Sequence, residues 1–456
     1  MQERENIEKK LPLGARITLW CNRHMSGYVF LMILAIITGL ASGAMARLFK
    51  VMIRRVSDLF IPRIVNGEIN WWIIGIPVAG ILLTGIFTRY IIHTNLTHIC
   101  AQLIHSIKEK TYRLRHNEVF SAVIGGTITL GMGGSSGAEG PIAATGGAIG
   151  SNIGQLLGLD NNRLKILIAC GASAGIAGIF SAPIGGLMFS LELVGISLTT
   201  VPVLTVTVSA FTAYLTVYAL EGQHHDLIVN LPSTFDWHML PAVICLGIFC
   251  GIYSMYYSGV TNYMDTVFKR LTNPWVRNLT GGVMLGMILL LFPSMFSTSY
   301  GVLGDVINGD FSSMAKGSVL SHLGGGENLL ALCATGILIL KCWAVSATNS
   351  SGGVGGDFAP TLVAGGILGY LFAFLYNRYT GSVLPAGLFA FYGMAGAMSG
   401  IIRTPIMSIF IVVEMTGCYG HFLPVSIIAL MSFLTVRFGA ISENAAKPIV
   451  RHLNWF

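Results

Sequence analysis

Apolar segments cover nearly the whole chain between residues 28 and 438, and this limits the chain to folds that lie inside a lipid bilayer. Of its 456 residues, 53% are hydrophobic and only 10% are charged, whereas soluble domains carry about 25% charged residues. A full span takes about 20 apolar residues, so the chain has room for roughly ten or more spanning or half-spanning helices. No room remains for a sizeable soluble domain. We predict an all-α polytopic membrane protein.

Glycine and the basic residues indicate how the helices pack and how the chain is oriented. The 56 glycines favour close helix packing and interrupted helices. Basic residues flank the apolar part at both ends: Arg4, Lys9, Lys10, Arg16, Arg23, Lys447 and Arg451. The positive-inside rule then predicts that both termini are cytoplasmic, and that the net charge of +7 reflects topology rather than a nucleic-acid partner. The N-terminal segment lacks the short apolar core and cleavage site of a removable signal peptide.

One glycine-rich stretch, residues 131–150, carries a charge where a membrane protein rarely has one. Glu139 is the only charged residue or histidine between Val119 and Leu159, and a carboxylate at membrane depth costs about 2.5 kcal/mol or more. Glycines precede it and Pro141 follows, which predicts a loop that leads into a helix N-terminus. The free N–H groups and positive dipole end there attract anions. A lone acid at this place competes with an anion for the same donors; the alternative is a glutamate bonded to backbone for structure alone.

A second glycine loop, residues 346–360, also leads into an apolar segment. Asp357 is the sole charged residue there between Lys341 and Arg378. A carboxylate that faced an anion in a low dielectric would repel it. We therefore expect the Asp357 side chain to turn away and to bond to backbone N–H groups or to Ser350 or Ser351, while its amide stays available. A direct role in proton transfer is the alternative.

The two halves of the chain repeat each other. Residues 171–195 and 393–417 match at five positions, each pair offset by 222 residues, as in Pro183 and Pro405 or Glu192 and Glu414. The glycine loops align with an offset of 219 residues. Duplicated halves with interrupted helices imply a pseudo-two-fold repeat with the substrate near mid-membrane. Glu139 and the backbone at residues 357–358 then converge, and two positive helix ends aimed at one point form an anion site.

The repeat defines five segments of the chain. We predict a cytoplasmic N-terminal segment (1–27), a first membrane repeat (28–220), a connector (221–238), a second membrane repeat (239–440) and a cytoplasmic C-terminal segment (441–456). His224 and His225 of the connector have no nearby third ligand, which favours a solvated loop over a metal site. The eight cysteines are scattered singly, so neither a disulfide framework nor a ligand cluster is implied. We expect no metal and no cofactor.

At the two glycine loops the chain resembles the CLC family of chloride channels and chloride/proton exchangers. Residues 137–141, Gly-Ala-Glu-Gly-Pro, look like the family's G-[KR]-E-G-P motif. Residues 356–360, Gly-Asp-Phe-Ala-Pro, look like its G-x-F-x-P motif. The resemblance implies an inverted repeat of many short, tilted and interrupted helices. It also implies a homodimer in which each subunit carries its own anion path, for chloride by default.

The family's functional residues carry over onto the matching positions. By resemblance, Glu139 is the gating glutamate, which blocks the path when ionised and swings aside or carries a proton when neutral. The N–H groups of Asp357 and Phe358 would hold the central anion. Those around Ala138 and Gly140 would hold an outer one.

The chain also departs from the family pattern. The family's earliest motif, G-S-G-I-P, supplies a serine hydroxyl to the central anion; here Thr94, or Asn95 if the register slips by one, stands in. Val450 falls where a tyrosine normally completes the site. Valine donates no hydrogen bond, so we expect the cytoplasmic side to be more open and to hold chloride less tightly. Leu193 stands where exchangers often carry a second glutamate for internal proton entry, and we expect its neighbour Glu192 to brace helices.

These features leave several functions to compare. Glu139 favours a chloride/proton antiporter, whereas Leu193 and Val450 favour an uncoupled chloride channel. The lost Ser-Gly-Ile-Pro pattern adds a fluoride-handling branch as a third possibility. An intramembrane enzyme with Glu139 as general base would need a nucleophile or a metal cluster, and the sequence shows neither, so we expect no enzyme. The expected partners are chloride, protons, the lipid of a bacterial inner membrane and a second copy of the chain.

Overall fold

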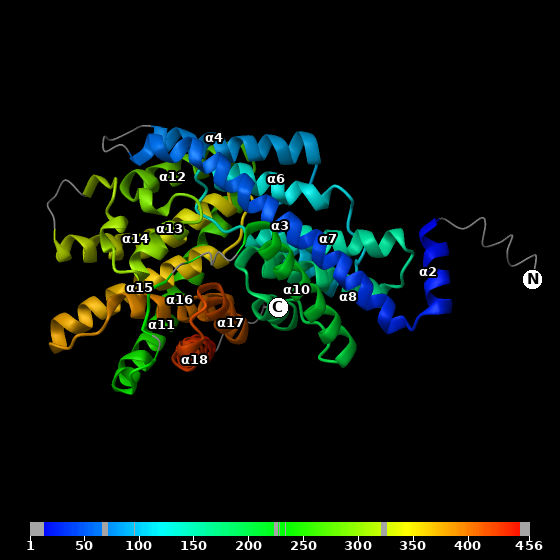
Figure 1. Cartoon of the computed structure of the whole chain (residues 1–456). Helices are drawn as coiled ribbons and strands as arrows, with labels where there is room; N and C mark the ends of the chain where they lie inside the picture. The colour runs from blue at the N-terminus through cyan, green and yellow to red at the C-terminus, as the bar shows by residue number, and fades with distance from the viewer. Residues whose placement is uncertain are drawn as a thin grey trace, which may run out of the picture.

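The computed structural model describes residues 13–446 except 66–71, 95, 223–226, 228, 233 and 321–325. Helices make up this part of the chain, in agreement with the predicted all-α class, and their lengths differ widely (Figure 1). Within the described ranges, nine helices are long and apolar enough to cross a membrane, and several shorter apolar helices lie between them. The predicted fold of short and interrupted helices is confirmed.

The first repeat follows a short helix, α2 (Leu13–His24), that occupies part of the predicted N-terminal segment. Its elements are α3 (Gly27–Val65), α4 (Trp72–Ile86) with a π-helical turn (Phe87–Ile92), α5 (Ile99–Lys108), α6 (Glu118–Gly131), α7 (Glu139–Leu156), α8 (Asn161–Phe180), α9 (Pro183–Met188) with a second π-helical turn (Phe189–Leu193), and α10 (Thr200–Glu221). Helix α3 is much longer than the apolar run that begins it, because its charged second half lines a cavity instead of lipid.

The predicted second repeat begins after the connector, of which the structure describes all residues except 223–226, 228 and 233. Its helices are α11 (Leu240–Arg270), α12 (Pro274–Leu291), α13 (Tyr300–Ile307), α14 (Glu327–Asn349), α15 (Phe358–Thr380), α16 (Ala386–Ile402), α17 (Pro405–Thr416) and α18 (Phe422–Ala446). Helix α18 thus continues past residue 440. The histidine pair at 224–225 and Val450 lie outside the described residues.

The backbone breaks at equivalent places in both halves. Ser181 ends α8 and Arg403 ends α16, both in the left-handed region, with φ of 54° and 64°. The next residues, Ala182 and Thr404, have φ of −125° and −126°. A proline then begins each of the helices α9 and α17. The first N–H of a helix has no acceptor within the helix, so proline loses no hydrogen bond at this position. Residues 161–188 therefore form two helices, α8 and α9, with a break between them.

Glycines let equivalent helix pairs cross at backbone distance. A Cβ on Gly146 of α7 would collide with the carbonyl oxygen of Gly171 on α8, and the reverse is also true. Gly365 of α15 and Gly393 of α16 form the same reciprocal contact in the second half. Only glycine permits this approach, which is the usual way for membrane helices to pack closely.

Two glutamates tie the halves together. The Glu192 carboxylate accepts hydrogen bonds from the N–H groups of Ile406 (3.2 Å) and Met407 (2.7 Å), in the first turn of α17. In return, Glu414 accepts from Ile184 (3.1 Å) and Gly185 (2.8 Å), in the first turn of α9. Each carboxylate thus satisfies N–H groups that a helix start leaves unpaired, at the positive end of the helix dipole. This geometry fits the expected bracing role of Glu192.

We predict that Glu414→Ala destabilises the fold. The substitution leaves the buried N–H of Gly185 and the partly buried N–H of Ile184 without an acceptor, and a buried unpaired N–H costs about 1–3 kcal/mol. Thermal unfolding in detergent should show a clearly lower Tm. Glu192→Ala is the matched control on the equivalent contact, where Ile406 is exposed and water can replace the carboxylate, so its effect should be smaller. An unchanged melting curve for Glu414→Ala would contradict the bracing role.

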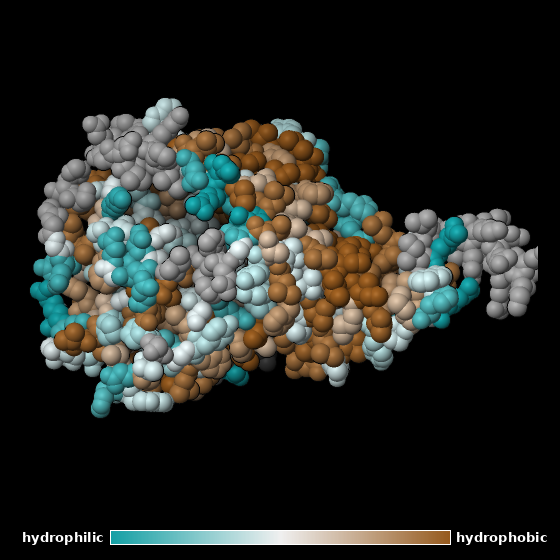
Figure 2. Space-filling model, viewed as in Figure 1, coloured by the Kyte–Doolittle hydropathy of each residue, from teal (hydrophilic) through white to brown (hydrophobic). Residues whose placement is uncertain are grey.

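The outer surface is apolar where lipid would contact it. Figure 2 shows a broad hydrophobic area where α3 and α10 lie, with hydrophilic residues gathered toward the ends of the molecule. Large exposed side chains on these helices include Ile36 and Leu40 of α3 and Phe211 and Leu215 of α10. Soluble monomers rarely expose continuous apolar surface of this extent. The protein is an integral, multi-pass membrane protein.

Candidate functional site

The two glycine loops meet at the centre of the molecule. Gly137 and Gly356 form an antiparallel bridge, and the N–H of each donates to the carbonyl of the other at 2.8 Å. Helix α7 begins at Glu139 and helix α15 at Phe358, each two residues after its bridge glycine. The bridge therefore fixes the N-termini of α7 and α15 next to each other. Both helix starts direct unpaired N–H groups and positive dipole ends toward the same region.

The Glu139 side chain lies across this junction. It is 2% exposed, and its Oε1 accepts a hydrogen bond from the N–H of Phe358 at 2.6 Å. The other oxygen, Oε2, has no hydrogen-bond partner among the described residues. The carboxylate thus occupies the place at the start of α15 where a helix N-terminus would bind an anion. A buried carboxylate with one unpaired oxygen is costly to keep, and ionisable groups at membrane depth commonly line an ion or proton path.

The bridge glycines make room for this carboxylate. A Cβ on Gly137 would overlap the carboxyl group of Glu139, and a Cβ on Gly356 would also meet it. For Gly137 the three nearest atoms all belong to the Glu139 side chain. The glycines before Glu139 therefore allow more than an open loop, because they let the glutamate fold back over the bridge.

The partner of the Asp357 side chain differs from the expected one. Its exposed carboxylate accepts from the side-chain amide of Asn349 at 2.9 Å. Asn349 in turn accepts from the Ser136 hydroxyl at 2.7 Å, and that hydroxyl lies 2.8 Å from the carbonyl of Gly356. The prediction of Ser350 or Ser351 as partner is wrong, since Ser351 donates back to its own helix at Ala347. Asn349, the last residue of α14, holds both glycine loops together.

Thr94 lies in the turn between the first π-helical turn and α5. Its Oγ1 is buried and has no hydrogen-bond partner in the described part of the chain. Helix α5 begins at Ile99, so Thr94 is not part of its first turn. The first N–H groups of the helix belong to residues nearer to Ile99. The neighbouring Leu96 packs in one cluster with Ala144 of α7 and Val354 of the second glycine loop. The turn therefore borders the junction, whereas Asn95 is not described.

Sequence reasoning missed Tyr257, which lies in the middle of α11. The residue is 1% exposed, and its hydroxyl has no hydrogen-bond partner among the described residues. Helix α11 packs against α14 and α15, the two helices on either side of the second glycine loop. A buried phenol normally finds a partner, so an unpaired one beside an anion-binding junction points to a ligand. No motif marks Tyr257, and in the sequence it is one of several tyrosines in an apolar helix.

The side of the junction near Asp357 carries titratable groups. His98, at the start of α5, contacts Asp265 of α11 at 3.1 Å, and Asp265 also pairs with Lys269 at 2.6 Å. His98 and Asp265 both interact electrostatically with Asp357. Leu193 sits at the end of the second π-helical turn and contributes no carboxylate. Protonatable side chains are therefore present near the junction although the glutamate expected beside Glu192 is replaced.

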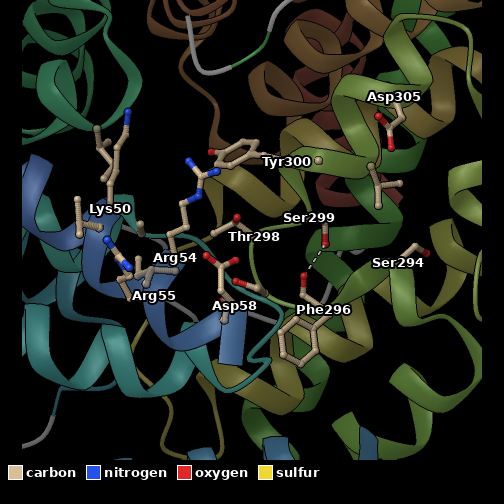
Figure 3. Close-up of a pocket in the computed structure, with 18 of the residues that line it drawn as sticks. Lys50, Arg54, Arg55, Asp58, Ser294, Phe296, Thr298, Ser299, Tyr300 and Asp305 are labelled. Atoms are coloured by element: carbon tan, nitrogen blue, oxygen red, sulfur yellow. Dashed lines mark hydrogen bonds between the residues drawn. The ribbon is translucent and has the colours of Figure 1, made fainter. Parts of the chain in front are cut away.

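A cavity of about 990 Å³ leads toward the start of α7 (Figure 3). The second half of α3 and residues 293–302 form much of its wall, and Ala138 lines it directly in front of Glu139. Five cationic side chains and three carboxylates border it. The cavity thus reaches Ala138, the residue immediately before Glu139 at the start of α7.

Comparisons with known proteins agree with this arrangement. A ClcB-like chloride channel protein of Ralstonia nicotianae is 26% identical over 84% of this chain and 86% of its own length. The H(+)/Cl(-) exchange transporter ClcA of Vibrio cholerae is 29% identical over 67% of this chain, a match that spans 64% of the relative. A ClcA exchange transporter of Vibrio campbellii is 26% identical over 87% of this chain and 84% of its own.

Solved structures share the fold. A slow cyanobacterial Cl-/H+ antiporter superposes with a TM-score of 0.73 at 21% identity, over 92% of this chain and 98% of the other. A CLC-type fluoride/proton antiporter also reaches 0.73 at 21% identity, over 90% and 96%. The family model of the voltage gated chloride channel matches residues 80–437, which hold both glycine loops and both interrupted helix pairs. The chain therefore belongs to the voltage-gated chloride channel family.

Proposed function

We propose that this protein exchanges chloride for protons across the membrane and that Glu139 is the group on which both ions act. The observation that carries the proposal is the 2.6 Å bond from Phe358 N–H to the Glu139 carboxylate, with the second oxygen unpaired. In its ionised form the carboxylate holds the donors that an anion needs. Protonation removes its charge, weakens that bond and frees the site, because charge-assisted hydrogen bonds are about twice as strong as neutral ones.

The anion path follows from the same donors. Once Glu139 leaves, the N–H groups of Asp357 and Phe358 hold the central anion, and those of Ala138 and Gly140 hold an outer one on the cavity side. The unpaired hydroxyl of Thr94 supports a contribution from the turn before α5. The looser site that we expect from Val450 stays a prediction.

Proton coupling is supported by the relatives and by the titratable groups. The Vibrio relatives are named exchange transporters, and Glu139 keeps a protonatable side chain at the junction. Leu193 cannot take up a proton, so protons that enter from the cytoplasmic side need another acceptor. His98 and Asp265, which are partly exposed and act on Asp357, are available for that step.

The test is chloride efflux from liposomes with external pH recorded at the same time. A chloride gradient should drive protons uphill into the vesicles at a fixed ratio to chloride. Chloride flux without linked proton movement would leave an uncoupled channel as the function. Absence of any anion flux from folded protein would reject the proposal as a whole.

Fluoride is the second candidate substrate. The structural likeness to a fluoride/proton antiporter and the loss of the Ser-Gly-Ile-Pro pattern favour it. A competition series of fluoride, chloride, bromide and nitrate in the same vesicles separates the two. Chloride transport blocked equally by bromide, and much less by fluoride, would support the main proposal.

We predict that Tyr257→Phe weakens chloride binding without weakening the fold. The hydroxyl has no protein partner to lose, so Tm should stay the same or rise. A hydrogen bond to a charged group is worth about 1.5–3 kcal/mol, which corresponds to about 10- to 100-fold in affinity. Calorimetric titration with chloride measures the change. Tyr256→Phe, which removes a hydroxyl bonded to the carbonyl of Ile339, is the matched control.

The remaining expectations concern assembly and location. We propose a homodimer with one anion path per subunit, in the inner membrane of a bacterium with both termini cytoplasmic, and two membrane repeats at about 28–220 and 239–440. Family membership, the bacterial relatives and the basic flanks support this arrangement. We also propose that the protein transports ions and catalyses no enzymatic reaction. The mass of the protein in detergent, measured by light scattering, tests the dimer.

A further inference from the structure

Lys341 is a buried cation that the mechanism above does not use. It lies inside α14, is 0% exposed, and its Nζ donates to the hydroxyls of Ser135 (3.0 Å) and Ser299 (3.4 Å). It forms no ion pair with a carboxylate in the described part of the chain. Burial of a charge is strongly unfavourable unless an opposite charge compensates it. No carboxylate among the described residues pairs with it, so an anion in the adjacent cavity would stabilise the charged form of Lys341.

The two hydroxyls connect this charge to the anion path. Ser135 belongs to the loop that leads to Glu139, and its N–H is anchored to Thr348 of α14 at 3.1 Å. Ser299 precedes α13 and lines the cavity in front of Ala138. A hydroxyl that accepts from an ammonium group directs its own hydrogen away from that group. Ser299 makes only a long bond of 3.4 Å to the carbonyl of Phe296, so its hydrogen is available to a stronger acceptor (Figure 3).

The cavity has more cationic than acidic side chains, five against three. Figure 3 shows Lys50, Arg54 and Arg55 on α3, with the Arg54 side chain reaching toward Thr298 and Tyr300 on the opposite wall. Clefts with an excess of one charge raise the local concentration of the opposite ion. Ser299 also stands at the start of α13, whose first N–H groups face the same space.

We propose that the end of this cavity next to Ser299 is a further halide-binding site, in addition to the central and outer positions of the anion path. The Ser299 hydroxyl donates to the anion, and the Lys341 ammonium group behind it supplies the counter-charge, with Ser135 as the second hydroxyl that holds this ammonium group. Single hydroxyl donors with one charge behind them suit a small monovalent halide rather than a phosphate or a carboxylate. The site rests on the proposed anion path, because it holds the ion that enters once Glu139 moves aside.

Bromide is the probe for a direct test, because its anomalous scattering locates it without any transport assay. Crystals of the wild-type protein in bromide should show a peak within hydrogen-bond distance of Ser299 Oγ. Lys341→Met should lose this peak, whereas Lys341→Arg should keep it because the charge remains. Ser299→Ala leaves Lys341 in place and should weaken the peak. Absence of the peak in the wild type, or its persistence in Lys341→Met, would overturn the proposal.

Transport supplies a second readout. Lys341→Met should raise the chloride concentration for half-maximal flux by about 10-fold or more, because a nearby charge acts strongly in a low dielectric. The ratio of protons to chloride should not change, since Glu139 is untouched. An unchanged half-maximal concentration would contradict the site. If the wild type carried no chloride at all, the proposed function would fail, and the bromide map would still decide this site by itself.

Discussion

Glu139→Gln is expected to abolish proton movement while chloride still crosses the membrane. Glutamine has nearly the same shape but takes up no proton, so chloride-driven proton transport should fall by about 100-fold or more, to background. Its neutral carbonyl oxygen can accept the Phe358 N–H only through a weaker bond than the ionised carboxylate does. Chloride flux should therefore persist or increase. Liposomes with simultaneous chloride and pH electrodes measure both quantities.

The control for this variant is Glu109→Gln. Glu109 is an exposed glutamate that pairs with His105 on α5, away from the junction. It should leave both fluxes as they are in the wild type. Proton movement that survives in Glu139→Gln at the wild-type ratio would show that another group carries the proton, and the exposed Asp357 would be the first to examine.

Gly137→Ala is expected to open the path without removing the glutamate. The new Cβ would overlap the Glu139 carboxyl group and would meet no backbone atom as closely, so the flexible side chain should move instead of the fold. Loss of its charge-assisted bond to Phe358, about 1.5–3 kcal/mol, shifts the balance from closed to open by about 10- to 100-fold. Chloride efflux should rise, and fewer protons should move per chloride.

Gly259→Ala is the matched control, because a Cβ on Gly259 of α11 has no neighbour within 4 Å. Both alanine variants should unfold at nearly the wild-type temperature, which separates an effect on the path from an effect on stability. If Gly137→Ala showed unchanged efflux and coupling, the closed position of Glu139 between the bridge glycines would not limit transport.

The sequence was sufficient for the features that repeat or that carry rare residues. The offset of 222 residues placed Pro183 and Pro405 at equivalent positions of the two halves, and in the structure each begins a helix after a backbone break. A lone carboxylate among glycines pointed to Glu139 because its cost at membrane depth is large. Local chemistry of this kind is visible in the residues themselves, since each inference depends on a single loop or on the comparison of two segments.

Features that depend on contacts between distant segments were not predictable. The hydroxyl of Tyr257 becomes significant only because α11 packs against α14 and α15, the helices on either side of the second glycine loop. Lys341 reads as an ordinary charge in an apolar helix until Ser135 and Ser299, which lie 206 and 42 residues away, are seen to surround it. The choice of Asn349 over Ser350 and Ser351 as the partner of Asp357 depends on which way the last turn of α14 faces. The rotation of α14 about its own axis determines that direction, and the amino-acid composition does not reveal it.

The central claim is that the Glu139 carboxylate and the transported anion occupy the same donors at the start of α15. An anomalous map of Glu139→Gln crystals in bromide tests it most directly. We expect a bromide ion within hydrogen-bond distance of the N–H of Phe358, at the place of the wild-type carboxylate, with the glutamine turned away. A glutamine still bonded to Phe358, with bromide bound only elsewhere, would contradict the claim.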